Sequence, residues 1–476
     1  MRPKLFLTGS ALLAGVLLVA GTAVPAAAGT GPHAAGPYTV EELRVVSGPS
    51  PFPVGCPGAR FDNKHVAGYE TEPMITVNPA NPRNLIATWK QDTGPVVAAR
   101  TDLVASSLDG GETWARRTVP GLTVCTGGTA DGVSDPWISA AGDGSVYFSG
   151  VPADLSSVPP PVAVVASRSR DGGRTWPAAV TVAPPRVGND TDRITGSPTL
   201  AGHAYLAWAN FTEVFPRTNT LEFSRTTNGG ATWSPPVSID QPGRFAADFA
   251  PRILVLPGGT LLAVFARGNL KTLSYTFRAA RSRDEGRTWS PSVRAGARPA
   301  PPPLIDPGTG AELPQPIYPS AAAGPDGSVY IAFEDSNSPA SGAIGIARSR
   351  DGGRTWTAGK LPGVSAFAFE PAIAAGPHGT VAVTWYDMRN DRPGDDALTA
   401  DVWFAHSGDH GATWRQTHIA GPTNLRPADL PVSNYVGEYQ GLAALRGRGF
   451  AAIFTLAAPQ ARNGPTDIFV ARIGPG

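Results

Sequence analysis

Short apolar runs recur along the chain in pairs, and each pair is divided by a turn and closed by an aromatic residue. The first pair surrounds Asn78-Pro79 and ends at Trp89, and the second surrounds Asp143-Gly144 and ends at Phe148. Apolar runs on either side of such a turn are typical of β-hairpins. The five later pairs end at Trp208, Phe265, Phe333, Trp385 and Phe454. The pattern therefore predicts seven hairpins and an all-β fold.

Six of these pairs are followed by an octapeptide of the form Ser/Thr-x-Asp/Asn-x-Gly-x-Thr-Trp. Its side chains suit a tight turn, because Ser and Asp bond to nearby amides and Gly adopts backbone angles that other residues resist. The tryptophans follow one another at intervals of 56 to 67 residues, a period that indicates one repeated structural unit. The copies are Ser107–Trp114, Ser169–Trp176, Thr226–Trp233, Ser282–Trp289, Ser349–Trp356 and Ser407–Trp414.

This octapeptide is the Asp-box, and the chain resembles the sialidase superfamily and other Asp-box propellers. Five copies fit fully, and the third departs from the pattern with Thr226 and Asn228. The resemblance implies a β-propeller with each box on the turn between the third and fourth strands of a blade. The boxes would then lie on the face away from the starts of the innermost strands, where a ligand is expected.

A seventh hairpin lacks a box and is followed by only one further strand, Asp467–Val470. At the other end of the chain, residues 38–46 have a strand-like sequence and no partner. Pairing these two segments would close the ring and remove exposed edges. We therefore predict a β-propeller of seven four-stranded blades closed by the N- and C-terminal strands. Six blades, as in sialidases, is the alternative.

The first 28 residues have the features of a secretory signal: Arg2 and Lys4, an apolar run, and small residues at Ala26–Ala28. An uncleaved membrane anchor is the alternative. We expect an N-terminal segment at 29–68 and the propeller at 69–476, in a secreted monomer with no membrane span after cleavage. In an exported protein, Cys56 and Cys125 are expected to form a disulfide, with two buried thiols as the alternative.

The net charge of +1 gives no argument for a nucleic acid or membrane partner. The sequence has no phosphate loop or dinucleotide fingerprint, so no cofactor is expected. Asp190 with Asp192, or the acidic run from Asp387 to Asp396, could supply oxygen ligands to calcium, but neither is an EF-hand loop. No bound metal is expected, and the predicted partner is a carbohydrate or glycoconjugate.

The resemblance implies three kinds of group at the channel mouth. In sialidases a tyrosine activated by a glutamate attacks the sugar, an aspartate acts as acid and base, and arginines hold the sugar carboxylate. Glu438 beside Tyr439 is the candidate for the Tyr–Glu pair, and Asp135 is the candidate acid, with Asp92 as a second. The candidates for substrate contacts are Arg193, Arg252, Arg389, Asp387 and Tyr435.

One departure from sialidases changes this interpretation. Where they carry Phe/Tyr-Arg-Ile-Pro at the first inner strand, this chain reads Thr71-Glu72-Pro73-Met74-Ile75, with the wrong charge for a carboxylate ligand. The acids could instead form the carboxyl pair of another glycosidase. That set is Glu72, Asp135, Glu370 and Glu438. The tyrosines could simply be packing residues, and Glu72 and Glu370 could cap strands.

The sequence therefore predicts a secreted glycoside hydrolase of the sialidase-like type, acting on sialosides or on another glycan. The alternative is a non-catalytic Asp-box propeller that binds a glycan or a protein.

Overall fold

The computed structural model describes residues 36–94, 98–211, 219–298, 318–335, 343–364, 367–392, 394, 397–426 and 436–476. Residues 34–476 form one compact unit. The signal segment predicted at 1–28 lies outside the described residues, and so does Tyr435. The described part has no α-helix and three short 3-10 helices, η1 (Asp62–Lys64), η2 (Val124–Thr126) and η3 (Pro377–Gly379). The prediction of an all-β fold is confirmed.

Successive strands pair in antiparallel sets of four, and each set begins with its innermost strand. The first two sets are β2 (Thr71–Val77), β3 (Leu85–Thr93), β4 (Ala99–Ser107) and β5 (Ala115–Thr118), then β6 (Gly132–Ala140), β7 (Val146–Ala153), β8 (Pro161–Ser169) and β9 (Val180–Val187). The next two are β10 (Asn189–Gly196), β11 (Ala204–Phe211), β12 (Asn219–Thr226) and β13 (Val237–Asp240), then β14 (Ala246–Val255), β15 (Leu261–Asn269), β16 (Tyr275–Ser282) and β17 (Val293–Arg298).

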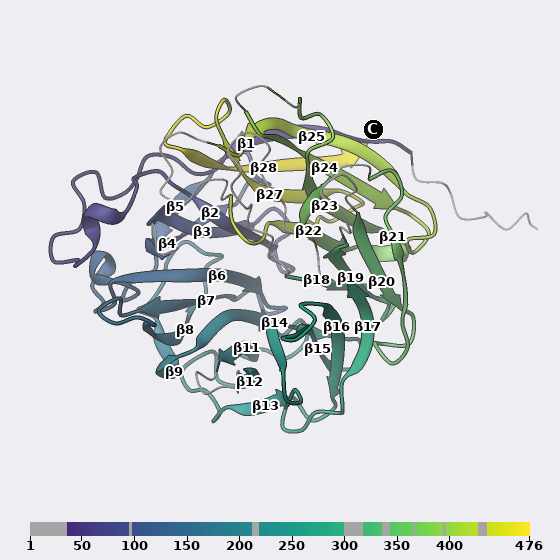
Figure 1. Cartoon of the computed structure of the whole chain (residues 1–476), viewed down its shortest axis with the longest axis horizontal. Coiled ribbons are helices and arrows are strands. Elements are labelled where there is room, and N and C mark those ends of the chain that lie inside the picture. Colours follow the sequence, from purple (N-terminus) through teal and green to yellow (C-terminus); the bar gives the residue numbers. More distant parts are fainter. Residues whose placement is uncertain are drawn as a thin grey trace, which may run out of the picture. The chain divides into compact units, whose positions relative to one another are not determined.

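Two more sets complete this part of the chain. They are β18 (Ser320–Ala323), β19 (Val329–Glu334), β20 (Ile344–Ser349) and β21 (Thr357–Lys360), then β22 (Ala368–Ala375), β23 (Val381–Asp387), β24 (Thr399–Ser407) and β25 (Arg415–Asn424). Single residue pairs, Ala99–Val133 and Asn219–Ala247, join neighbouring sets into two eight-stranded sheets. Figure 1 shows the sets following one another around a common centre.

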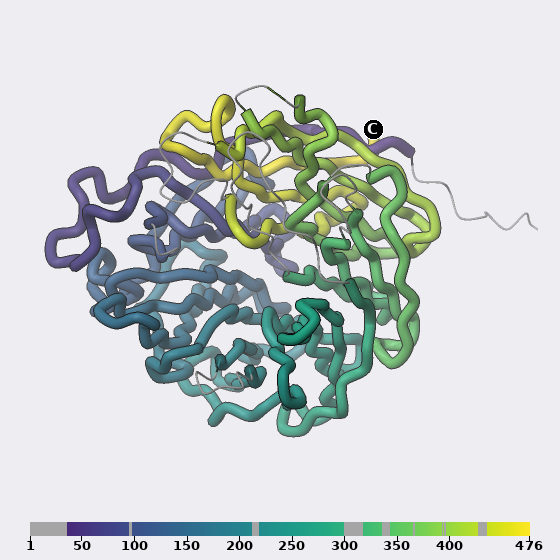
Figure 2. Tube along the Cα trace, in the orientation of Figure 1, coloured from purple at the N-terminus to yellow at the C-terminus, as the bar shows by residue number. Residues whose placement is uncertain are grey.

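The remaining set joins the two ends of the described chain. It is formed by β26 (Gly441–Ala444), β27 (Phe450–Ala457), β28 (Thr466–Pro475) and β1 (Tyr38–Val45). β1 runs antiparallel to β28, with a register from Tyr38–Pro475 to Val45–Phe469. In Figure 2 the purple N-terminal trace accordingly runs beside the yellow C-terminal trace. The predicted pairing of N- and C-terminal strands is confirmed, and it covers an edge that would otherwise be free to aggregate.

Each Asp-box begins at the last residue of a third strand and is held by its own side chains. In the first box, Ser107 Oγ accepts the N–H of Gly111 at 2.8 Å, and Asp109 Oδ1 accepts the N–H of Thr113 at 3.0 Å. The irregular third box keeps the same bonds, because Asn228 Oδ1 accepts the N–H of Thr232 at 3.0 Å. The boxes are therefore turn-forming units, and Asn replaces Asp without changing the turn.

The core lies between neighbouring sets, where large side chains recur at matching positions. Trp89, Trp208 and Trp385 lie on the second strands of their sets and are fully buried. Burial of one such side chain stabilises the fold by roughly 1.5–3 kcal/mol. The predicted disulfide between Cys56 and Cys125 is present, and it ties the segment before β2 to η2.

Candidate active site

Five innermost strands carry a β-bulge at a corresponding place in their pairing with the second strand. The register shifts lie between Thr71/Met74, Ser134/Trp137, Asp190/Arg193, Phe249/Arg252 and Phe369/Ala372. The first bulged residue is left-handed in each strand, with φ of 57° at Glu72 and Asp135, 51° at Thr191, and 50° at Ala250 and Glu370. Such backbone is strained for residues other than glycine and gathers at functional sites. The bulge bends the strand and redirects its side chains.

Three carboxyl groups come together at these strand starts. One carboxylate oxygen from each of Glu72, Asp135 and Glu438 lies within 4.8 Å of the other two. Lys90, from β3, donates from Nζ to Glu72 Oε1 at 3.0 Å, and both side chains are buried. The structure therefore brings three of the predicted acids into one cluster with one ammonium group.

Two further groups complete this carboxyl cluster. The backbone N–H of Thr191 donates to both Asp135 Oδ2 and Asp190 Oδ1, at 2.9 Å each, which holds these two acids side by side. Burial, reinforced by Asp135, raises the pKa of Asp190 well above its usual range. The Tyr318 hydroxyl interacts with Glu438. Burial, and then the charges of Glu72 and Asp135, raise the pKa of Glu438 to about 8. Glu438 therefore carries a proton at neutral pH.

The same cluster is the part of the described chain that could hold a cation, since three carboxylates are within ligating distance. The Lys90 ammonium already neutralises Glu72 in this arrangement. The expectation of no metal stays a prediction.

An arginine and three aromatic rings lie beside this cluster. The Arg193 guanidinium lies 4.5 Å from the ring centroid of Trp137, 5.7 Å from that of Tyr318 and 5.8 Å from that of Tyr439. Its Nη1 donates to the carbonyl of Pro319 at 3.2 Å. Burial lowers the pKa of Arg193, and nearby tyrosines and acids counter part of that effect. Arg193 is thus a buried cation facing the channel mouth, which suits the contact with substrate expected from the sequence.

Tyr439 is placed differently from the sequence prediction. Its hydroxyl donates to the carbonyl of Pro136 at 3.1 Å, and its ring packs against Trp137. Burial, and then Glu72, raise its pKa well above the usual value, and burial, and then Glu438, do the same for Tyr318. The tyrosine that interacts with Glu438 is Tyr318. We therefore correct the predicted Tyr439–Glu438 pair, because the Tyr439 hydroxyl is turned to the backbone of the neighbouring set.

The two other predicted arginines, Arg389 and Arg252, have different surroundings. Arg389 Nε donates to Asp387 Oδ2 at 2.8 Å, its Nη1 donates to Gln416 at 3.0 Å, and its guanidinium lies 3.9 Å from the Trp403 ring. Arg252 shares Trp137 with Arg193, at 5.4 Å from the indole centroid. Among the described residues two predicted arginines therefore meet, and the third is neutralised by Asp387.

Glu370 and Asp92 are not among the three carboxyl groups of the cluster. Burial, followed by the charges of Glu438 and Glu72, raises the pKa of Glu370 well above its usual range, and its backbone carbonyl accepts a bond from Gln440 at 2.7 Å. Asp92 pairs with Arg100 at 3.1 Å and accepts the N–H of Gly68 at 2.9 Å. Asp92 thus stabilises the segment before β2, and its predicted role as an acid is unsupported.

Sequence reasoning left Lys90, Asp190 and Tyr318 out of the candidate active site. A signal for Tyr318 was available, because Tyr318-Pro319 occupies the same place in the repeat as Glu72-Pro73. Lys90 pairs across from Thr71 and so lies beside the first bulge. Strand register, which the sequence pattern locates only approximately, decides both positions.

The chain is similar to one protein family and to several solved structures. Residues 218–462 match the family described as BNR repeat-like domain. A protein of unknown function from Dyadobacter fermentans superposes with a TM-score of 0.51 at 12% identity, covering 92% of this chain and 99% of the other. No curated protein sequence matches the chain. Within the described residues, no helix has the length and apolar character that a membrane crossing needs.

Two enzymes of known activity are more distantly similar. Penicillium chrysogenum α-L-arabinanase, complexed with arabinobiose, has a TM-score of 0.45 at 15% identity and covers 91% of this chain and 98% of its own. Trypanosoma rangeli sialidase, complexed with 2,3-difluorosialic acid, has a TM-score of 0.44 at 13% identity and covers 91% of this chain and 58% of its own.

Proposed function

The chain belongs to the BNR repeat-like domain family, in the sialidase-like superfamily, and from this premise we propose that it is a glycoside hydrolase. The approach of Glu72, Asp135 and Glu438 to within 4.8 Å carries the proposal. Carboxyl groups this close cannot all be ionised, so their proton affinities separate. A protonated acid beside an ionised carboxylate is the pair that glycoside hydrolysis requires.

Each carboxyl has a role that follows from its surroundings. Glu438, with a pKa of about 8, is the general acid that protonates the departing glycosidic oxygen. Asp135 is the nucleophile, and its oxygen forms an ester bond to the anomeric carbon as the bond to the leaving group breaks. Glu438 then takes a proton from water, the water oxygen attacks the anomeric carbon, and Asp135 is released. Glu72, held by Lys90, positions the pair and keeps the proton on Glu438.

The spacing favours hydrolysis with retention of anomeric configuration. Retaining enzymes hold their carboxyl groups about 5–5.5 Å apart, whereas inverting enzymes leave about 6.5–9.5 Å for a water molecule. One oxygen from each of the three carboxyl groups lies within 4.8 Å of the other two, which is closer to the spacing of retaining enzymes.

A neutral glycan is the substrate class that the charges favour. Sialic acid carries a carboxylate, and the cluster would repel it. Of the three predicted arginine ligands, Arg389 is neutralised by Asp387, and only Arg193 and Arg252 share a ring. The second candidate is a sialidase that uses Tyr318 as the nucleophile. The interaction of Tyr318 with Glu438, beside Arg193, supports it.

The test is turnover of a panel of 4-methylumbelliferyl glycosides, neutral and sialylated, by the unaltered chain and three variants. Glu438→Gln and Asp135→Asn should each lower kcat by about 10²–10⁴-fold. The matched control is Glu112→Gln, an exposed acid within the first Asp-box, which should keep full activity. Turnover of no substrate would favour the non-catalytic propeller, and full activity in Glu438→Gln would reject the proposed acid.

We also propose that the ring has seven blades and that the protein acts outside the cell. Each set, from β2–β5 through β22–β25, has the same strand order, and the set of β26, β27, β28 and β1 adds one more. The Cys56–Cys125 disulfide suits an oxidising compartment.

A further inference from the structure

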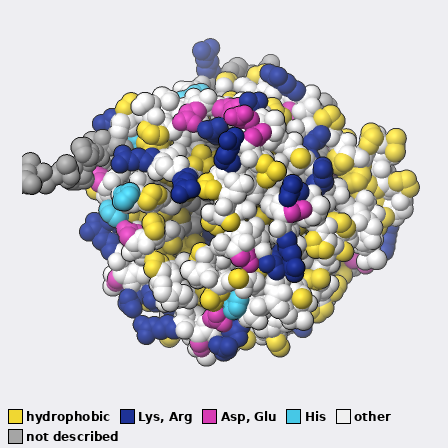
Figure 3. All heavy atoms as spheres, turned by 180° about the vertical axis from the view of Figure 1, so that it is seen from behind, with side chains coloured by type: hydrophobic (Ala, Val, Ile, Leu, Met, Phe, Trp, Pro, Cys, Tyr) yellow, Lys and Arg dark blue, Asp and Glu magenta, His cyan; other side chains and the backbone are white. Residues whose placement is uncertain are grey.

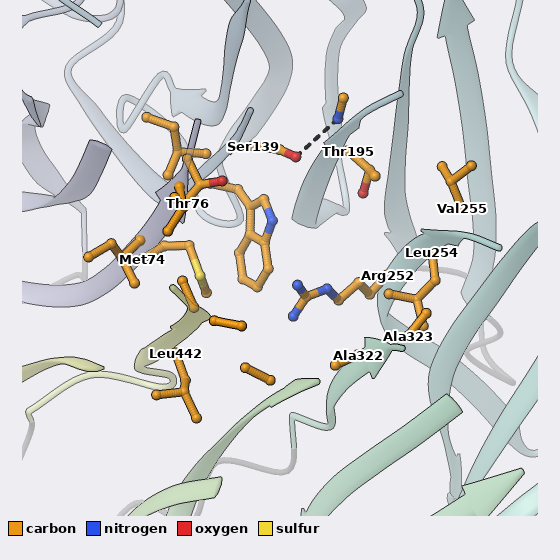
Figure 4. A pocket seen from close by; sticks show the side chains of 18 of the residues that line it. Met74, Thr76, Ser139, Thr195, Arg252, Leu254, Val255, Ala322, Ala323 and Leu442 are labelled. Atoms are coloured by element: carbon orange, nitrogen blue, oxygen red, sulfur yellow. Dashed lines mark hydrogen bonds between the residues drawn. The ribbon is translucent and has the colours of Figure 1, made fainter. Parts of the chain in front are cut away.

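We propose that a pocket beside the third Asp-box binds a small oxyanion, such as the carboxylate of an acidic sugar or an inorganic sulfate. The pocket has a volume of about 230 Å³, and its lining includes Tyr147, Arg168, Arg170, Gly229 and Trp233. None of these five residues lines the central channel, where Arg252 and the other side chains labelled in Figure 4 lie. The proposal therefore does not depend on glycoside hydrolysis.

Two residues of this pocket carry buried hydrogen-bonding atoms that have no partner among the described residues. They are Tyr147 Oη and Trp233 Nε1. In four other boxes the tryptophan N–H donates to a glycine carbonyl of its own box, at 2.9, 3.1, 3.2 and 3.1 Å. Buried polar groups are normally hydrogen-bonded, because burial without a partner costs free energy. The pocket therefore offers two hydrogen-bond donors to a ligand.

Two arginines give the pocket a positive charge. The Arg168 guanidinium lies 5.5 Å from the ring centroid of Tyr147, and the charge of Arg170 acts on the same tyrosine. Arg168 pairs with Asp143 at 3.2 Å, whereas Arg170 is exposed and has no ion pair within the described part of the chain. Two cations thus stand beside one acid, so an anion fits the charge of the pocket.

The repeats show which group this pocket lacks. The second strand of three sets has a buried tyrosine as its second residue, and these are Tyr147, Tyr205 and Tyr330. In two of these sets, the next Asp-box supplies a polar side chain from its fourth residue. His410 Nδ1 lies 3.2 Å from the hydroxyl of Tyr330, and the charge of Glu285 acts on Tyr205. The corresponding fourth residue in the box after Tyr147 is Gly229, which has no side chain to offer.

The carboxylate of Glu285 shows how an anion is held at such a place. Its Oε2 lies 3.8 Å from Arg225 Nη1, and its Oε1 lies 3.5 Å from His203 Nδ1. Arg225 directly precedes the box of its own set, as Arg168 does. An oxyanion in the pocket would take the place that the Glu285 carboxylate has in the neighbouring interface, with Arg168 in the position of Arg225.

Calorimetric titration of the full chain with glucuronate, inorganic sulfate and glucose tests the proposal. We expect saturable binding of at least one of the two anions, and binding of glucose that is weaker by about tenfold or more, because glucose has the sugar ring without the charge. Tighter binding of glucuronate than of sulfate would identify an acidic sugar as the ligand. The reverse order would identify a free oxyanion or a sulfate group.

Gly229→Glu supplies the missing carboxylate from the chain itself, and it should abolish binding of both anions. Gly229 has a φ of 76°, near the 58° of Glu285 and the 62° of His410, so the backbone of the box accepts a side chain at this position. The added side chain would meet the far end of Arg168, which is flexible enough to move aside.

Tyr147→Phe keeps the test decisive if Gly229→Glu does not fold, because it removes one hydroxyl and keeps the ring. Tyr147→Phe and Arg170→Met should each weaken anion binding by about tenfold. Tyr330→Phe and Arg350→Met are the matched controls, because they change the equivalent pair in an interface that a box side chain already fills. Absence of anion binding, binding that persists in all three pocket variants, or an equal loss in the two controls would overturn the proposal.

Discussion

At the scale of single residues, the candidate site consists of three carboxyl groups that would repel one another if all were ionised at neutral pH. Glu72, Asp135 and Glu438 are held within 4.8 Å, and Lys90 supplies one compensating positive charge. The excess negative charge is removed by protonation, and Glu438 is the member whose pKa is raised to about 8. The cluster thus prepares one acid and one base from residues of the same type.

The pH dependence of kcat/KM checks this division of roles. Glu438 must be protonated to act as an acid, so kcat/KM should fall as the pH rises through about 8, by tenfold per pH unit above it. In Glu438→Gln this basic limb should disappear from the remaining activity, because no group then titrates in that role. A basic limb unchanged in Glu438→Gln would assign the titration to another residue.

The same shift affects stability in a defined direction. A carboxyl whose pKa is raised on folding binds its proton more tightly in the folded state. Its favourable contribution is complete below pH 4.5, the usual pKa, and is lost as the pH rises toward 8. The folded chain is therefore stabilised less at neutral pH than below pH 4.5, because the surroundings of Glu438 disfavour its ionised form.

At the scale of strands, the β-bulge is the repeated feature that redirects the side chains of the candidate site. It recurs in β2, β6, β10, β14 and β22, and its left-handed residue is an acid in three of them. The two other strands carry Thr191 and Ala250 at this position. The left-handed bulge thus occurs in strands with and without an acid at this position. The side chain alone decides which strands supply a carboxyl group.

Ala250→Gly measures how much the left-handed backbone of the bulge lowers the free energy of unfolding. Ala250 is buried with φ of 50°, and a left-handed L-residue costs roughly 1–2 kcal/mol, whereas glycine costs roughly 0.5–1 kcal/mol in chain entropy. We expect Ala250→Gly to stabilise the chain by about 0.5–1 kcal/mol in urea unfolding. Ala263→Gly, in the regular part of β15, should destabilise it. A loss of stability in Ala250→Gly equal to that in Ala263→Gly would show that the bulge is unstrained.

The sequence predicted the strands better than it predicted their details. Periodic apolar runs and the box identified the hairpins, the closing strand near 38–46 and the cysteine pair, because each depends on local pattern or composition. The left-handed bulges were not predicted, since Thr191 and Ala250 give no signal for positive φ. Because the bulges were not predicted, the sequence showed at which end of the ring these side chains lie, but it did not show in which direction they point.

The site was predicted in part for the same reason. Glu72, Asp135 and Glu438 were chosen because they lie at or before the starts of inner strands, and the structure brings their carboxyl groups together, while their catalytic roles stay a prediction. Tyr439 was chosen for its neighbour in sequence, but its hydroxyl donates to the carbonyl of Pro136, and Tyr318 from another set interacts with Glu438. Arg389 was chosen for its place after β23, where Asp387 two residues earlier neutralises it.

At the scale of the whole unit, the Asp-boxes, which are the most similar part of the repeats, lie away from the proposed catalytic groups. The Asp-boxes connect third and fourth strands, whereas the carboxyl cluster lies where innermost strands begin. On the face shown in Figure 3, basic side chains are dispersed among acidic and hydrophobic ones, so this face has no continuous basic patch of the kind that binds nucleic acid. The ring supplies a rigid frame, and the β1–β28 pairing completes it.

The central claim is that Asp135 and Glu438 are the nucleophile and the acid of one glycosidase site, and azide rescue tests it most directly. The measurement is the anomeric configuration of the glycosyl azide formed by Asp135→Gly and by Glu438→Gly, on an activated aryl glycoside of the best substrate. Azide should enter the space left by Asp135 and give the inverted product, and it should attack the Asp135 ester in Glu438→Gly and give the retained one. No azide product from either variant, or the same anomer from both, would contradict the account.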